Sequence, residues 1–399
     1  MRILALALGV PFPPIGGGLT RTFHLLRSLA SHHHVTLVAF TYGDVHDPPP
    51  YAIEVIEIPW RNSPDYEAMT GGDLEASQQA YRRLAFDTDE PWFASVMDPQ
   101  VMQTALGNTG PYDVVLLEGT PLARFLPAIP RRVPRVLDLF DIHSTIAQRA
   151  ARQSAGGDPA LDREFERTLA FEREAVANCD LCFAVSDADA TTARDLLGAS
   201  VVHVVPNGVD TSYFKPASAA TEPGMLLFTG RMSYGPNIDA VQHFVDDILP
   251  RIRTEVPDAT FHIVGASPTA AVSALAGDSV VVHGRVEDVR PFHHRAEVVV
   301  VPIRAGGGTR LKVLEAAACG KAIVSTELGA EGLPLLDGRD LVIAATSGDF
   351  AAAVVTLLRD PEQRQRLGVG ARAATSTFDW ATIGDSARAL IEQRITDRG

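Results

Sequence analysis

The 399-residue chain is poor in lysine, in cysteine and in long apolar runs, and each shortage excludes a class of protein. It has three lysines, Lys215, Lys312 and Lys321, and its 49 acidic residues against 35 basic ones give a net charge of −14. This balance argues against nucleic acid bound by a broad basic surface. The apolar start, residues 1–8, is too short to span a bilayer and runs into glycine and prolines. We therefore expect a first strand there and no transmembrane segment.

Three cysteines do not make a disulfide framework. Cys179 and Cys182 have a CxxC spacing, but a zinc site would need two more ligands and a redox pair belongs at a helix N-terminus. This pair opens an apolar run instead. We interpret the two residues as buried thiols in a reducing cytoplasm.

A glycine-rich segment after an apolar run is the strongest functional signal. Residues 298–303 read as a buried strand, three glycines follow, and Thr309 is suited to cap a helix from Arg310 to about Cys319. Glycine lets the backbone approach a ligand, and free amides at a helix start point toward it, so we expect a phosphate or pyrophosphate here. Glu315, one turn after Lys312, is placed to accept hydrogen bonds from a sugar hydroxyl. The alternative is a surface pair of Lys312 and Glu315.

Short β-branched or leucine-rich runs alternate with longer helical patterns, which is typical of parallel, doubly wound α/β sheets. The predicted strands are residues 3–8, 35–40, 53–58, 114–118, 136–140, 181–185, 201–205, 225–229, 260–264, 280–283, 298–302, 322–325 and 341–344. The predicted helices are residues 19–31, 160–177, 238–255, 286–295, 310–319, 348–359 and 361–376.

The pattern restarts after a segment rich in turn formers. This predicts two Rossmann-like domains, residues 1–205 and 223–378, joined by a linker at 206–222. Residues 379–399 form an amphipathic helix that we expect to pack back toward the first domain. Ligands of such sheets bind beyond the carboxyl ends of the strands, so two facing domains would share a central cleft.

Along nearly its whole length the chain resembles the GT-B-fold retaining glycosyltransferases of family 4, a group of bacterial sugar transferases also called group 1. The matching stretches keep the family's order and spacing; they are residues 205–216, 227–231, 236–240, 284–289, 306–316 and 325–332. The resemblance implies a nucleotide-sugar-dependent hexosyltransferase of class EC 2.4. Its first domain would bind the acceptor and its second domain the nucleotide sugar.

The resemblance also assigns residues of the second domain. Arg231 matches the arginine that contacts the donor pyrophosphate, Glu315 the glutamate that holds the ribose hydroxyls, and the backbone near Val286 the contact to the base. The phosphate-cradling amides match Gly308, Thr309, Arg310 and Leu311. Two positions depart from the family: Gly307 stands where relatives carry a glutamate and Asn237 where many carry a lysine. Lys312 or Arg310 would replace the missing cation.

In the first domain, Gly17 and Gly18 resemble the family's glycine loop beside the donor phosphate and the acceptor. His143, after the strand at 136–140, matches the histidine that contacts the transferred sugar, with a core or loop histidine as the alternative. The acceptor would be read by this domain, where residues 44–50 and 61–103 look irregular. We expect no cofactor and no essential metal, because the spacing of Asp138 and Asp141 is not the D-x-D of the other glycosyltransferase fold.

The predicted function is therefore retaining transfer of a sugar from a nucleotide-diphosphate donor to a glycan, lipid-linked or small-molecule acceptor. His143, Arg231, Lys312 and Glu315 are the predicted catalytic residues. A sugar-nucleotide epimerase of the same fold and a catalytically silent sugar-nucleotide-binding protein are the alternatives. The expected location is the cytoplasm, either free or in peripheral contact with the inner face of the membrane.

Overall fold

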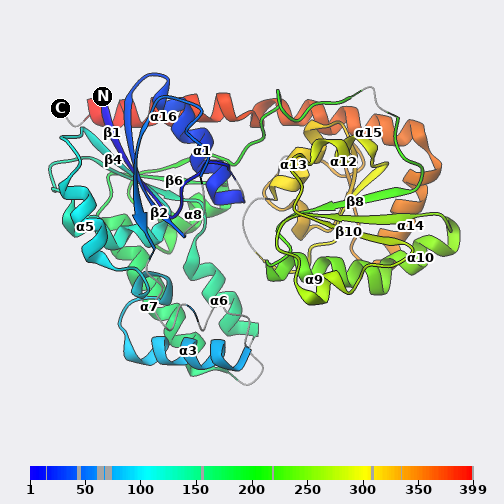
Figure 1. Ribbon diagram of the computed structural model, residues 1–399, viewed down its shortest axis with the longest axis horizontal. Helices are drawn as coiled ribbons and strands as arrows, with labels where there is room; N and C mark the ends of the chain where they lie inside the picture. Colours follow the sequence, from blue (N-terminus) through cyan, green and yellow to red (C-terminus); the bar gives the residue numbers. More distant parts are fainter. Residues whose placement is uncertain are drawn as a thin grey trace. The chain divides into compact units, whose positions relative to one another are not determined.

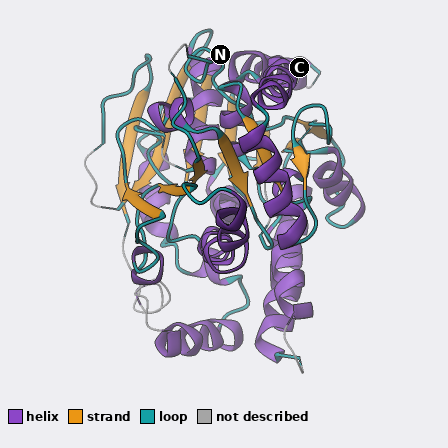
Figure 2. Cartoon of the chain, turned by 90° about the vertical axis from the view of Figure 1, so that its right-hand side faces the viewer, coloured by secondary structure: helices purple, strands orange, loops and turns teal. Residues whose placement is uncertain are grey.

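The computed structural model describes residues 1–14, 16–42, 46–60, 67, 74–153, 157–217, 220–306, 310–333 and 335–397. The chain divides into two compact units. Unit 1 comprises Met1–Pro206 together with Ile383–Gly399, and unit 2 comprises Asn207–Thr382. Each unit is built on a parallel β-sheet flanked by helices (Figures 1 and 2).

The sheet of unit 1 has seven parallel strands in the order β3-β2-β1-β4-β5-β6-β7. The strands are β1 (Arg2–Ala7), β2 (His34–Thr41), β3 (Glu54–Pro59), β4 (Val114–Glu118), β5 (Arg135–Leu139), β6 (Leu181–Ala184) and β7 (Val202–Val204). Strands β4 and β5 are buried along their whole length, as expected for a sheet covered on both faces. The order reverses between β1 and β4, and the carboxyl ends of strands at such a switch point are where ligands bind in open α/β sheets.

The helices of unit 1 are α1 (Gly17–Ala30), α3 (Leu74–Asp87), α4 (Trp92–Ser95), α5 (Pro99–Gly107), α6 (His143–Gln153), α7 (Pro159–Ala177), α8 (Asp187–Asp195) and most of α16 (Trp380–Thr396), with a 3₁₀ segment at Thr120–Ala128. Figure 1 shows α3 and α6 beside α7 and away from the sheet. Our expectation of irregular structure over residues 61–103 is therefore wrong for α3, α4 and the start of α5. Ala80 and Leu84 give α3 a buried stripe four residues apart, which its many polar residues hide in the sequence.

The sheet of unit 2 has six parallel strands in the order β10-β9-β8-β11-β12-β13. The strands are β8 (Met225–Thr229), β9 (Thr260–Val264), β10 (Val280–Gly284), β11 (Val298–Val301), β12 (Ala322–Ser325) and β13 (Val342–Ile343). The helices are α9 (Gly235–His243), α10 (Leu249–Glu255), α11 (Ala270–Ser273), α12 (Arg290–Arg295), α13 (Leu311–Ala318), α14 (Ser347–Arg359) and α15 (Pro361–Ala374), with short 3₁₀ segments at Leu328–Ala330 and Thr375–Phe378.

Two predicted helices of unit 2 are shorter than expected. The helix predicted over 238–255 is interrupted by a π-helical turn, Phe244–Ile248, because Pro250 has no N–H to donate to the fourth residue before it. The helix predicted from residue 286 begins only at Arg290, where the Asp288 carboxylate accepts the Arg290 amide at 2.9 Å. By contrast, every predicted strand is present, with ends that agree to within one residue.

Candidate functional site

Two glycine turns meet at the carboxyl end of the unit 2 sheet. The Gly230 amide, directly after β8, donates to the Val264 carbonyl at 3.0 Å, and the Gly265 amide, directly after β9, donates to the Gly284 carbonyl at 2.9 Å. A Cβ atom added to Gly265 would lie 1.7 Å from the Gly230 carbonyl oxygen. Glycine is therefore required where these two turns touch, since any larger residue would push the β8 turn away.

Lys312 brings its ammonium group to the β8 turn from the first turn of α13. Its Nζ donates to Asn237 Oδ1 at 2.7 Å, and Asn237 Nδ2 donates to the Arg231 carbonyl at 2.8 Å. The same Nζ lies 3.9 Å from the centre of the Phe228 ring and 2.9 Å from where a Cβ on Gly230 would be. One lysine, one amide side chain and a bare stretch of backbone thus meet at the end of β8.

The charges on this part of α13 are poorly solvated. Burial, together with the nearby Arg310 guanidinium, lowers the pKa of Lys312 to about 7. Burial raises the pKa of Glu315, one turn further along the helix, to about 7. Both groups therefore change their charge near neutral pH, and an incoming anion would favour the protonated form of each.

The helix start differs from the sequence prediction by one residue. Helix α13 begins at Leu311, and Arg310, which is 7% exposed, occupies the N-cap position that we had given to Thr309. The expected phosphate-binding residues Gly307, Gly308 and Thr309 lie outside the described part of the chain.

Arg231 and Val286 occupy the loops after β8 and β10. The Arg231 side chain is exposed, and its carbonyl is the group that Asn237 holds. Val286 follows Gly284, which has a positive φ of 68°, and its side chain is half-buried against the core of unit 2. The structure thus brings Lys312, Asn237 and the Arg231 backbone together.

In unit 1, Gly17 and Gly18 are the first residues of α1, which starts two residues before the predicted helix. One turn later the buried Arg21 donates two hydrogen bonds to Asp138, from Nε at 2.6 Å and from Nη2 at 2.8 Å. A third bond runs from Arg21 Nη1 to the Pro206 carbonyl at 3.1 Å. Asp138, noted in the sequence only for its spacing, is thus fully occupied by an internal ion pair on β5, one strand beyond the switch point of the sheet.

Glu118, at the end of β4, is the second buried carboxyl group of this region. Thr22 donates to it at 3.3 Å, and burial together with the neighbouring Asp138 carboxylate raises the pKa of Glu118 well above its usual range. Glu118 therefore favours its protonated form beneath α1.

His143 is the first residue of α6 rather than a loop residue. Its backbone amide donates to Glu172 Oε1 at 2.7 Å, and the next amide, of Ser144, donates to Glu172 Oε2 at 3.1 Å. The imidazole ring lies against Phe93, with ring centres 4.6 Å apart. Burial of the ring lowers the pKa of His143 to about 4, so the side chain is neutral at pH 7.

The sequence did not predict a role for Glu172 or Phe93. Glu172 lies 29 residues after His143 on a different helix, and its neighbours give no motif. The sequence signal that could have found Glu172 is its position on the buried face of the amphipathic helix α7. A buried carboxylate requires a hydrogen-bond or ionic partner.

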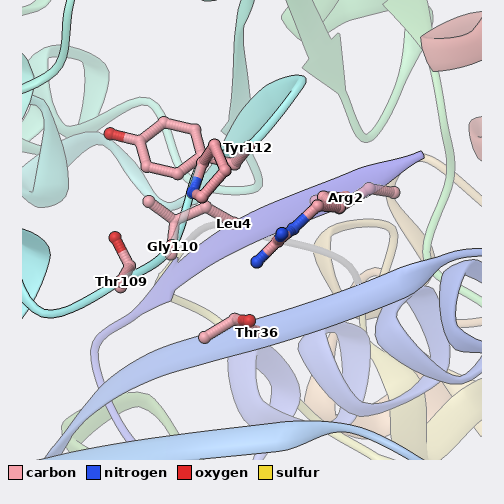
Figure 3. Close-up of a pocket in the computed structure, with 8 residues that line it drawn as sticks. Arg2, Leu4, Thr36, Thr109, Gly110 and Tyr112 are labelled. Atoms are coloured by element: carbon pink, nitrogen blue, oxygen red, sulfur yellow. The ribbon is translucent and has the colours of Figure 1, made fainter.

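Other features of the described chain are less informative. The pocket in Figure 3 lies at the opposite, amino-terminal edge of the unit 1 sheet, where Arg2, Thr36 and Tyr112 surround a space barely large enough for one water molecule. Within the described ranges no three His, Cys, Asp or Glu side chains are grouped to hold a metal ion. Cys179 and Cys182 are free thiols, and burial raises the pKa of both. None of the described helices is both long and apolar enough to cross a membrane.

Comparison with known proteins places this architecture in a family. Residues 16–208 match the model of the glycosyl transferase 4-like domain, and residues 223–360 match that of glycosyl transferases group 1. Glycogen synthase of Mycobacterium tuberculosis is 28% identical over 418 residues, covering 96% of this chain and 92% of that protein.

Solved structures agree on the fold. Sucrose-phosphate synthase from Thermosynechococcus elongatus has a TM-score of 0.74 at 17% identity, with complete coverage of both chains. Anabaena HepE, solved in complex with UDP and glucose, has a TM-score of 0.65 at 18% identity, covering 98% of this chain and all of that one. With the two sheets described above, these matches show that the chain is an enzyme of the group 1 glycosyltransferases and has their GT-B fold.

Proposed function

We propose that the protein transfers a sugar from a nucleoside diphosphate donor to an acceptor hydroxyl, with retention of the anomeric configuration and without an essential metal. Unit 2 holds the donor diphosphate. The observation that carries this assignment is the position of the Lys312 ammonium beside the bare backbone of Gly230, at the carboxyl end of β8.

Breaking the bond between sugar and phosphate develops negative charge on the leaving diphosphate. A catalyst must stabilise that charge more in the transition state than in the ground state. Lys312 is suited to this task because Asn237 and Phe228 fix its position before the donor arrives, so little reorganisation accompanies the reaction. Arg231, in the turn after β8, supplies a second cation, which is exposed.

Similar proteins indicate the chemical class of the donor nucleotide but not its base. HepE has been crystallised with UDP, which supports a nucleoside diphosphate. Glu315 is assigned to the ribose hydroxyls, and the backbone near Val286 to the base.

Retention by double displacement needs a carboxylate nucleophile. The carboxyl pair Glu118 and Asp138 is unsuitable, because both groups are buried and Arg21 occupies Asp138. We favour attack on the same face as departure: the acceptor oxygen bonds to the anomeric carbon, the sugar–phosphate bond breaks, and the departing phosphate oxygen takes the acceptor proton. The neutral His143 orients the transferred sugar and does not act as a nucleophile.

A thermal-shift screen tests the assignment, because a ligand that binds only the native state raises its melting midpoint. UDP, GDP and ADP are compared with uridine, guanosine and adenosine, with and without EDTA. We expect one diphosphate, and not its nucleoside, to raise the midpoint in both conditions. The matching nucleotide sugar, incubated alone, should change only by slow hydrolysis. Conversion of the sugar to an epimer, or nucleotide binding with no transfer to any acceptor tried, would contradict the proposal.

A further inference from the structure

Helix α6 carries a cationic stripe that leads away from His143. Its eleven residues include no acidic side chain, although the chain as a whole has a net charge of −14. Ile146, Arg149 and Arg152 are exposed and lie three residues apart, so they follow one another along one face of the helix. At 1.5 Å and about 100° per residue, Arg152 lies about 13 Å from His143 along the helix axis and about halfway around it, with Arg149 between them.

The described part of the chain gives neither arginine of this stripe a partner. Within the described part of the chain, Arg149 and Arg152 form no ion pair, whereas Arg163 on the adjacent α7 faces Asp89 at 3.7 Å. Two exposed, unpaired guanidinium groups are well suited to carboxylate or phosphate oxygens, which they bind with paired hydrogen bonds.

From this arrangement we propose that the acceptor is an anionic oligosaccharide. Its reacting hydroxyl lies near His143, and its negative groups lie along α6 on Arg149 and Arg152. This inference rests on the proposed function, because it takes His143 as the end of the acceptor path. It adds the charge and the extended form of the acceptor.

The composition of the stripe favours a soluble glycan over a lipid surface. A membrane-binding helix has a broad face of large apolar residues, but the exposed side of α6 offers only Ile146. An isoleucine between polar groups is instead suited to the apolar face of a sugar ring. A single sugar phosphate bound by Arg149 and Arg152 could not also place a hydroxyl at His143, because the path from His143 to Arg152 is several sugar rings long.

Titration calorimetry with tetragalacturonate, which carries four carboxylates, and with the neutral maltotetraose tests this proposal on the full chain. We expect tetragalacturonate to bind, and R149Q/R152Q to weaken its binding roughly 5- to 20-fold, as two charge-assisted contacts would. The matched control R131Q/R132Q removes two exposed arginines that precede β5, at the amino-terminal edge of the unit 1 sheet. This control should change binding less than twofold. Added salt should weaken wild-type binding more than that of R149Q/R152Q.

Equal weakening by both double variants, or equal binding of the neutral and the anionic glycan, would overturn the proposal. So would an absence of tetragalacturonate binding, or arginine-dependent binding to phosphatidylglycerol vesicles in its place. The diphosphate thermal shift on the same samples separates the two hypotheses. If the shift persists while the glycan fails to bind, only the acceptor proposal falls; if the shift is absent, the donor assignment falls.

Discussion

Replacing Lys312 by methionine separates a ligand-binding role of this lysine from a structural one. Methionine is unbranched and of similar length, so it can fill the space over the Phe228 ring. A charge-assisted hydrogen bond contributes about 1.5–3 kcal/mol, so its loss should weaken nucleoside diphosphate binding by roughly 10- to 150-fold. The nucleoside without phosphates should bind as before.

The fold should tolerate this change. Removing the ammonium leaves Asn237 Oδ1 without a donor, at a cost of about 1 kcal/mol, but it also removes a charged group held away from water. The two effects oppose each other, so we expect the urea midpoint of K312M to stay close to that of the wild type. Calorimetry with UDP or GDP and urea denaturation on the same preparation measure both quantities. A large loss of stability with unchanged diphosphate affinity would refute the reasoning.

The pH dependence gives a second readout of the same variant. The pKa of Lys312 in the folded protein, about 7, lies below its ordinary value of 10.5, so the buried amine destabilises the fold most below pH 7 and progressively less from pH 7 to 10.5. A bound diphosphate favours the protonated amine. Affinity should therefore fall about tenfold between pH 6 and pH 8 as Lys312 loses its proton. K312M should flatten this profile, and a wild-type profile without slope would contradict the assignment.

Three further substitutions test the surrounding structure. G265A places a Cβ 1.7 Å from the Gly230 carbonyl oxygen, so we expect it to displace the β8 turn and weaken diphosphate binding in calorimetry, whereas G277A, with open space around it, should not. R21M leaves a buried carboxylate unpaired and should cost about 3–5 kcal/mol in urea denaturation, and a loss below 1 kcal/mol would show that the ion pair is dispensable. E172A removes the side chain that caps α6 and should cost about 1 kcal/mol by the same measurement; an unchanged midpoint would refute that role.

The strands were predictable because parallel sheets bury both faces of each strand. Runs such as Val298–Val301 are apolar at every position and are bounded by residues that favour turns. Such a run is too short for a buried helix, so a strand is the natural prediction. The helices α3 and α6 lack this advantage. Their apolar stripes are narrow and pack mainly on α7, so their local sequence resembles that of a polar loop.

The candidate site was predictable where a local motif fixes the chemistry. The segment around Lys312 predicts an anion site, which stays a prediction, and its lysine lies beside the Gly230 turn. Its partner Asn237 is 75 residues away in sequence. The family resemblance made Lys312 or Arg310 the substitute for a cation missing at Asn237, but no local pattern predicted a hydrogen bond between Lys312 and Asn237. The ion pair of Arg21 with Asp138, 117 residues apart, was missed for the same reason. Such contacts depend on tertiary packing, which a single sequence does not contain.

The burial of Lys312 also makes this protein open to selective chemical labelling. An amine that is about half deprotonated at neutral pH is a nucleophile, and the amines that compete with it for an acylating reagent are two other lysines and the α-amino group of Met1. A reactive ester tethered to a nucleoside diphosphate would place its electrophile next to that amine. The resulting adduct, located by mass spectrometry, would identify the donor nucleotide without knowledge of the acceptor.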